Sequence, residues 1–180
     1  MFGSVTGVSA SARHGFVKAR QHAIELLQGL GVKDDAHCGA TVRHLFDVRR
    51  DAGQLNLRQV HLVQAELLDE LLQQGFQLGE GSLGENVTTA GIALDSLPRN
   101  ARLHLGATAI VEVTGLRDPC VKMDRFQPGL RRALTAQRDG VRRFTRGGVM
   151  AIVVQGGLVR AGDPIKVELP GQPAIPLDLV

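Results

Sequence analysis

Short β-prone runs separated by glycine turns constrain the fold of this chain more than any other feature of its sequence. Gly106 lies between two of them, Arg102 to Leu105 and Ala107 to Val113, and the second run is rich in valine and isoleucine. The remaining runs are Ser4 to Ala10, Gln59 to Val63, Val149 to Gln155, Leu158 to Arg160 and Ile165 to Leu169. So many short strands, with only two or three helices, predict a mainly β (α+β) fold in which a β-barrel carries a few helices packed at its rim.

Three stretches have the spacing of apolar residues that is typical of a helix. The clearest is Gln64 to Gln74, where Ala65 and three leucines form one stripe and Gly75 follows. Lys18 to Leu30 repeats apolar residues at helical intervals, and Leu130 to Gln137 follows a proline and a glycine. We therefore expect helices over these three stretches.

Length and composition are those of an ordinary globular protein and exclude several other classes. The chain has 180 residues, of which 43% are hydrophobic and 22% charged, and a formal net charge of +3, so one domain is the simplest expectation. Its two cysteines are far apart and neither belongs to a CxxC pair, which argues against a disulfide framework or a structural zinc site. No apolar run could span a bilayer and no signal sequence is recognisable, so we expect a cytoplasmic protein without a membrane partner.

The segment VTGLRDPCVKMD, from Val113 to Asp124, places Cys120 directly behind a proline and between two cations, Arg117 and Lys122. Nearby positive charge favours the thiolate, the form that attacks electrophiles or binds soft metals. Proline restricts its own backbone and that of the preceding residue, so we expect the thiol on a stiffened turn that leaves a strand. A lone cysteine is also often a small buried hydrophobe, and composition and spacing leave both interpretations open.

Three other regions carry candidate functional groups. The loop GVKDDAHCGATVRH contains His37, for which contact with a metal or substrate competes with a solvated loop whose acids cap a helix. Glycines between Gly79 and Gly91 would let backbone amides approach an anion, and they are equally typical of β-turns. Arginines gather from Arg131 to Arg146, where the alternatives are a solvated face, an anionic small molecule or nucleic acid. Tyr and Trp are absent, so we expect no nucleic-acid partner.

Several motifs in order along the chain resemble the MOSC domain family, which is named after the carboxy-terminal domain of molybdenum cofactor sulfurases. They are DAHCGATVRH, LNLRQVHLV, LGENVTTAGIALDSLP, LHLGATAIVEVTGLRDPCVKMD and GLVRAGDPIKVELP. The resemblance implies a single MOSC domain over residues 4–170, followed by a C-terminal tail at 171–180. It is closest to the stand-alone bacterial members of the family, whose mostly β, barrel-like fold agrees with the strand pattern.

The resemblance implies that chemistry takes place at Cys120, which matches the family's single cysteine in an Arg-x-Pro-Cys context. Its thiol would be the catalytic group, carrying sulfur as a persulfide or binding the molybdenum of a pterin cofactor, molybdopterin. Arg117 and Lys122 would favour the thiolate and contact this anionic cofactor. Arg143 and Arg146 could hold the cofactor phosphate, an expectation that rests on their charge and not on a motif.

Two further motifs supply the rest of the expected cofactor site. Glu85, Asn86 and Thr88 belong to a segment that matches the family's GEN-[IV]-T motif, and we expect them to shape the pocket, with hydrogen bonds from Asn86 and Thr88 to the ligand. His37 belongs to the matched DAH-x-G segment and would form a second polar wall. Cys38 occupies a variable place in that motif, so no catalytic role is carried over to it.

Three functions of different classes remain open at this point. The protein could be a molybdenum-cofactor oxidoreductase that reduces N-hydroxylated bases or amines with electrons from a separate donor protein, which is the function we favour. It could be a sulfur carrier that receives a persulfide on Cys120 from a donor protein for metal–sulfur cofactor assembly. It could also be a non-catalytic cofactor-binding module. Pyridoxal phosphate belongs to a different domain of the full-length sulfurases and is not expected here, and the sequence makes no prediction about the oligomeric state.

Overall fold

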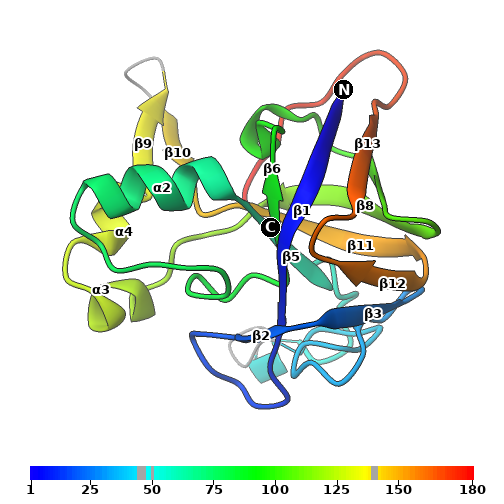
Figure 1. Cartoon of the computed structure of the whole chain (residues 1–180), viewed down its shortest axis with the longest axis horizontal. Coiled ribbons are helices and arrows are strands. Elements are labelled where there is room, and N and C mark those ends of the chain that lie inside the picture. The colour runs from blue at the N-terminus through cyan, green and yellow to red at the C-terminus, as the bar shows by residue number, and fades with distance from the viewer. Residues whose placement is uncertain (44–47, 50, 139–141) are drawn as a thin grey trace.

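In a computed structural model of the chain, which describes residues 1–43, 48–49, 51–138 and 142–180, seven strands close into a barrel (Figure 1). Their bounds are Phe2–Ala10 (β1), Val60–Gln64 (β5), Val87–Ala90 (β6), Arg102–Leu105 (β7), Ala109–Leu116 (β8), Val149–Gln155 (β11) and Pro164–Glu168 (β13). Around the barrel the order is β13, β7, β8, β11, β5, β6 and β1, and β1 pairs with β13 to close it. Neighbouring strands are antiparallel except β5 and β6, which are parallel.

Shorter strands and helices lie around the barrel. The strands are Ala19–Gln21 (β2), Ala23–Leu27 (β3), Gly31–Val32 (β4), Thr135–Arg138 (β9), Arg142–Thr145 (β10) and Gly157–Arg160 (β12). Within the described ranges the helices are Ala65–Gln73 (α2), Lys122–Phe126 (α3) and Leu130–Ala133 (α4), with a 3₁₀ turn at Leu94–Ser96 (η1). None of these helices is long and apolar enough to cross a membrane.

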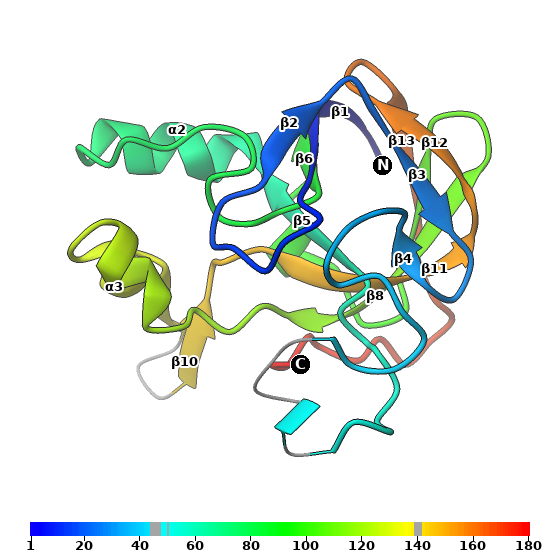
Figure 2. The ribbon, with the colours of Figure 1, turned by 90° about the horizontal axis from the view of Figure 1, so that it is seen from below.

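The helices gather on one side of the barrel. Figure 1 shows α2, α3, α4 and the β9–β10 hairpin together there, and the view from below in Figure 2 places α2, α3 and β10 on the same side. We call this group the helical lobe. Elsewhere, β2 extends the barrel sheet beyond β1, and β12, β3 and β4 form a small separate sheet.

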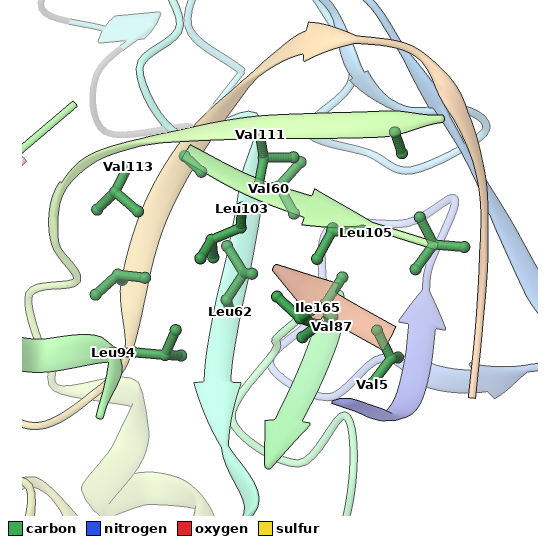
Figure 3. Close-up of a cluster of buried hydrophobic side chains, with 14 of the residues drawn as sticks. Val5, Val60, Leu62, Val87, Leu94, Leu103, Leu105, Val111, Val113 and Ile165 are labelled. Carbon is green, nitrogen blue, oxygen red and sulfur yellow. The ribbon is translucent and has the colours of Figure 1, made fainter. Parts of the chain in front are cut away.

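The interior of the barrel is filled by aliphatic side chains that alternate along the strands. In β8, Val111 and Val113 are fully buried, whereas the residues that alternate with them, at 110, 112 and 114, are half-buried. Leu103 and Leu105 of β7 point inward in the same way. Other strands add Val5, Val60, Leu62, Val87 and Ile165 (Figure 3). Burying one such side chain stabilises a fold by roughly 1.5–3 kcal/mol, so this core drives closure of the barrel.

A second apolar cluster joins the helical lobe to the outer wall of the barrel. Its buried members are Val63, Leu67, Leu68, Leu71, Leu83, Met123, Leu130 and Leu134. Val63 follows Leu62 along β5 and points to the opposite face, so one strand contributes to both clusters. The segment after β8, which includes α3 and α4, therefore packs on this second cluster and not on the core inside the barrel.

The predicted fold class is confirmed, and most predicted elements are present. The helix expected at Gln64 to Gln74 is α2, and every predicted β-run overlaps a strand. The helix predicted at Leu130 to Gln137 is shorter than expected. It ends at Ala133, because Thr135 begins β9 and pairs with β10.

The helix predicted at Lys18 to Leu30 is wrong, because this stretch forms β2 and β3. In β3, the buried Ile24 and Leu26 alternate with more exposed residues, which is the period of a strand. β3 pairs with both β12 and β4. Pairing between distant segments therefore overrides a local spacing that also fits a helix.

The last ten residues, expected as a tail, lie against the end of β8. The Leu116 amide donates to Asp178 O at 2.8 Å, and Leu177 packs against the barrel core. Gly115 permits this approach, because a β-carbon there would lie 2.6 Å from Asp178 O. This segment is packed on the strand that leads to the Cys120 loop.

Candidate functional site

Cys120 lies in the loop that leaves the barrel at the end of β8 and enters the helical lobe at α3. Its thiol is free and half-buried. The Arg117 amide donates to Gly148 O and the Thr145 hydroxyl donates to Arg117 O, both at 3.0 Å. The Met123 amide donates to Cys120 O, also at 3.0 Å. The loop that carries the thiol is therefore fixed on both sides, which suits a reactive group.

Arg117 is a half-buried positive charge close to Cys120. Its Nη1 atom is 3.6 Å from Sδ of Met123, a member of the apolar cluster beneath the helical lobe. Burial lowers the pKa of Arg117, whereas its electrostatic interactions with Cys120 and Glu85 raise it. A guanidinium stays protonated in proteins even so. Arg117 therefore supplies a fixed positive charge within the loop that carries Cys120.

His61 is a buried neutral side chain next to Arg117. Its Nε2 atom lies 2.7 Å from Gly147 O, so the proton of the neutral ring is on Nε2. Burial, followed by the positive charge of Arg117, lowers the pKa of His61 to about 3. The His61 amide also donates to Asn86 Oδ1 at 3.2 Å. His61 therefore ties the Gly147 turn to β5 without adding charge to the site.

Asp35, which follows β4, gathers four residues around one buried carboxylate. Oδ2 lies 2.8 Å from Lys18 Nζ, and it accepts hydrogen bonds from the Ser11 amide and the Asn86 side-chain amide at 3.2 Å. Oδ1 is 3.0 Å from the His37 amide and 3.1 Å from His37 Nδ1. Burial acts to raise the pKa of Asp35, but the His37 hydrogen bonds and the Lys18 charge hold it well below its usual range. Asp35 is therefore ionised at neutral pH.

Lys18 and His14 bring the amino-terminal loop into the same cluster. Burial lowers the pKa of Lys18, and the Asp35 carboxylate opposes this shift. The His14 ring meets His37 edge-on, with 5.1 Å between ring centroids. Burial and then His37 lower the pKa of His14, and the charges of Lys122 and Lys18 lower it further. Lys122 comes two residues after Cys120, and its charge acts on His14. The histidine pair therefore lies close to the thiol loop.

A ring contact joins the amino-terminal loop and α3 directly, since the Phe16 and Phe126 centroids are 5.0 Å apart. Three segments that are distant in sequence therefore meet at the helical lobe. The residues that they bring together are His14, Lys18, Asp35, His37, Arg117, Cys120 and Lys122. Sequence reasoning named His37 and the three residues of the thiol loop. It missed Lys18 and His14, which no local spacing identifies, and it included Asp35 only as the first residue of the matched DAH-x-G segment.

The three residues of the GEN motif are buried beneath this cluster. Glu85 accepts hydrogen bonds from the amides of Gly81 at 2.6 Å and Leu83 at 3.0 Å, and the Thr88 hydroxyl donates to it at 3.3 Å. Burial raises the pKa of Glu85. Asn86 donates to Asp35 and to Ser9 O, the latter at 3.2 Å. All three side chains thus organise the loops around the cluster, and their direct contact with a ligand stays a prediction.

Arg146, one of the two arginines expected to hold a phosphate, does not join the cluster. Arg146 forms two hydrogen bonds to the Glu70 carboxylate on α2, at 2.7 and 2.5 Å. It lines a small, shallow pocket together with Gln64, Leu67, Leu94, Asp95 and Gly148. Arg143 belongs to β10, and its side chain lies outside the described residues. Binding of a phosphate by either arginine remains a prediction.

Cys38 is close to the cluster in sequence but has different surroundings. It is a half-buried free thiol, and burial, followed by the Asp35 charge, raises its pKa. Its other charged neighbours are Arg43 and Asp34. In the described ranges, no three His, Cys, Asp or Glu side chains are arranged to bind a metal ion. Cys38 therefore has two acidic neighbours and one cationic neighbour, whereas the loop of Cys120 carries Arg117 and Lys122.

Comparisons with known proteins agree with this architecture. A family model described as the MOSC domain matches residues 37–166. The crystal structure of the YuaD protein from Bacillus subtilis is similar with a TM-score of 0.74 and 25% identity, over 95% of this chain and 98% of the other. Two structures of YiiM, from Escherichia coli and Geobacillus stearothermophilus, are each 19% identical, with TM-scores of 0.64 and 0.61. Both similarities cover 97% of this chain. They cover 73% of the Escherichia coli chain and 77% of the Geobacillus stearothermophilus chain. No curated protein sequence matches.

Proposed function

Because the chain belongs to the MOSC domain family, we propose that it binds a molybdenum cofactor at the cluster around Cys120 and reduces N-hydroxylated bases or amines. The observation that supports this most is a half-buried free thiol beside the half-buried Arg117 guanidinium, with Lys18 and Lys122 in the same cluster. These groups combine a soft metal ligand with several fixed cations. A cytoplasmic location remains part of the proposal.

The groups of the cluster fit an anionic metal–pterin cofactor. A thiolate is a ligand that soft metals prefer, and the pterin dithiolene brings further sulfur ligands with it. Cys120 would bind the metal, while Arg117 would place a positive charge beside the anionic metal centre. Lys18, His37 and Lys122 would face the anionic parts of the cofactor. When bound, the cofactor would supply a metal that exchanges electrons in pairs with the substrate.

The proposed reaction consumes two electrons and two protons. The N–O bond breaks, the nitrogen gains an N–H bond, and the oxygen leaves as water. We assign the transfer of one proton to His37, because the Asp35 carboxylate holds its ring in place through Nδ1 at 3.1 Å. The electrons would come from a separate donor protein.

The molybdenum content of protein purified from a host that makes the cofactor tests this proposal. We expect stoichiometric metal in the wild type, loss of the metal in Cys120→Ala and retention in the matched thiol control Cys38→Ala. Reductase activity on an N-hydroxylated amine should be lost with the metal. Equal metal in wild type and Cys120→Ala, or none in either, would rule out the thiol as the ligand.

The second candidate, a sulfur carrier, is favoured by the same thiol and guanidinium, because a persulfide anion also benefits from a fixed cation. The Cys120 thiolate would attack the outer sulfur of a donor persulfide, forming a new S–S bond and releasing the donor thiolate. Intact mass would then show one added sulfur on wild-type protein and none on Cys120→Ala. Cofactor binding that persists in Cys120→Ser, without activity or added sulfur in the wild type, would instead support a non-catalytic binding module.

A further inference from the structure

The charges of the chain are distributed unevenly, and the positive excess lies next to Cys120. The segment from Arg117 to Arg146 contains nine Lys or Arg residues and three Asp residues, a net charge of +6, whereas the whole chain carries +3. The rest of the chain is therefore net negative, at −3. This segment builds α3, α4 and the β9–β10 hairpin, so these elements carry the positive excess of the helical lobe, whereas α2 carries three acidic residues.

Several of these cations face solvent without an acidic partner. Lys122 and Arg125 on α3 and Arg132 on α4 are exposed, and within the described ranges none of them forms an ion pair. Arg131 is also exposed, and its Nε donates to Pro119 O at 3.1 Å, which keeps it beside the thiol loop. These four residues define what we call the basic face.

Apolar side chains are exposed next to the basic face. Val121, which directly follows Cys120, is 58% exposed, and Phe126 is 38% exposed. Val17, from the amino-terminal loop that contacts α3 through Phe16, is 45% exposed. An apolar centre surrounded by charge is the anatomy of a protein–protein interface. Nucleic-acid surfaces instead combine basic residues with aromatic rings that stack on bases, and Phe126 already packs against Phe16.

We propose that the basic face is the docking site of an acidic electron-transfer protein that carries a flavin or an iron–sulfur centre. This inference rests on the proposed reductase function, because each turnover needs two electrons from outside. Net positive charge attracts an acidic partner and orients it during the encounter. Val121 and Lys122 immediately follow the thiol, so a donor bound here brings its redox centre to the proposed metal ligand over the shortest path along the chain.

Charge reversal on the basic face tests the proposal. We would compare Arg125→Glu/Arg132→Glu with a matched control, Arg160→Glu/Lys166→Glu, whose residues are exposed on β12 and β13 of the barrel. The probe is reduced flavodoxin, an acidic flavoprotein. We expect kcat/KM for flavodoxin to fall by about 10–100-fold in the first variant and by less than about 2-fold in the control. Turnover with reduced methyl viologen, which needs no docking site, should not fall in either.

Binding separates this inference from the proposed function. Flavodoxin affinity, measured by surface plasmon resonance at low and high salt, should weaken with salt for wild type and control and be low throughout for the reversed variant. Charge-dependent binding without any reductase activity would leave the docking site standing and remove the proposed reaction. Viologen-driven activity with equal flavodoxin affinity in the reversed variant and the control would overturn the docking site. Binding of a short RNA more tightly than flavodoxin, lost in the reversed variant, would overturn the choice of partner.

Discussion

Lys18 and Asp35 form a buried ion pair, with 2.8 Å between Lys18 Nζ and Asp35 Oδ2 and with side chains only 6% and 2% exposed. The pair joins the amino-terminal loop to the chain that follows β4. His37 and Asn86 hydrogen-bond to the same carboxylate. One acidic residue therefore holds together the parts of the site that come from three separate segments of the chain.

Removing one partner of this pair should destabilise the fold more than removing both. Asp35→Asn leaves the Lys18 ammonium buried without a counter-charge, which costs about 3–5 kcal/mol. Lys18→Met/Asp35→Asn removes both charges and should cost clearly less than Asp35→Asn alone. Urea unfolding of wild type, both single variants and the double variant gives the coupling energy. Costs that simply add would mean that the two charges do not stabilise each other.

His61 should make stability depend on pH just below neutrality. Its folded pKa of about 3 lies below the unfolded value of about 6.5, so only the unfolded chain gains a proton as the pH falls between these values. Stability is therefore full above about pH 6.5 and falls by about 2 kcal/mol between pH 7 and pH 5. The pKa of Asp35 is depressed in the fold, so its stabilising effect is complete above about pH 4 and is lost only as the pH falls below that value.

Urea unfolding at pH 7 and pH 5 measures this slope. His61→Gln should lose most of it, whereas His22→Gln, at an exposed histidine, should keep it. An unchanged slope in His61→Gln would show that another group is responsible. The same experiment reports on the site, because His61 carries the Gly147 turn that borders Arg117.

The thiol loop could be predicted from the sequence because its determinants are local. Arg117, the proline, Cys120 and Lys122 lie within six residues of one another, and their charges act on the thiol whichever fold surrounds them. The strands of the barrel were also predictable, because alternation and glycine turns are short-range patterns. For the same reason α2 was identified from its leucine stripe.

The Asp35 cluster could not be predicted, because its contacts exist only after the barrel closes. Asp35 and Asn86 are 51 positions apart in the chain, and their side chains meet at 3.2 Å. Lys18 lies at the start of a stretch whose apolar spacing also fits a helix. Pairing of β3 with β12, more than 130 positions later, decides against that helix. The local spacing of residues does not indicate contacts between segments that are so far apart in the chain.

Glu85 should matter through the two loop amides that it binds. Glu85→Ala leaves the Gly81 and Leu83 amides without their acceptor, at a cost of about 2–4 kcal/mol. Glu85→Gln keeps one oxygen acceptor and should cost about half as much. Thermal or urea unfolding distinguishes the two variants. If Glu85→Gln instead kept full stability and lost molybdenum, Glu85 would be a direct ligand contact, as the motif match implied.

Arg146 should act through Glu70 and not through a cofactor phosphate. Both guanidinium nitrogens that hydrogen-bond here are occupied by the Glu70 carboxylate, and the hydrogen bonds from Arg146 lower the pKa of Glu70. The side chains are 28% and 41% exposed, so solvent screening limits their coupling to about 0.5–1 kcal/mol. A cycle of Arg146→Gln, Glu70→Gln and the double variant should measure that value at low salt and a smaller one at high salt.

Molybdenum content separates the two roles of Arg146. We expect Arg146→Gln to retain the metal of the wild type, because its guanidinium faces the pocket beside η1 and its partner is on α2. Lys18→Met removes a cation from the Asp35 cluster and should lower the metal content at equal folded fraction. If Arg146→Gln lost the metal and Lys18→Met kept it, the phosphate would bind beneath α2. The cofactor would then extend from the thiol loop across the helical lobe, away from the Asp35 cluster.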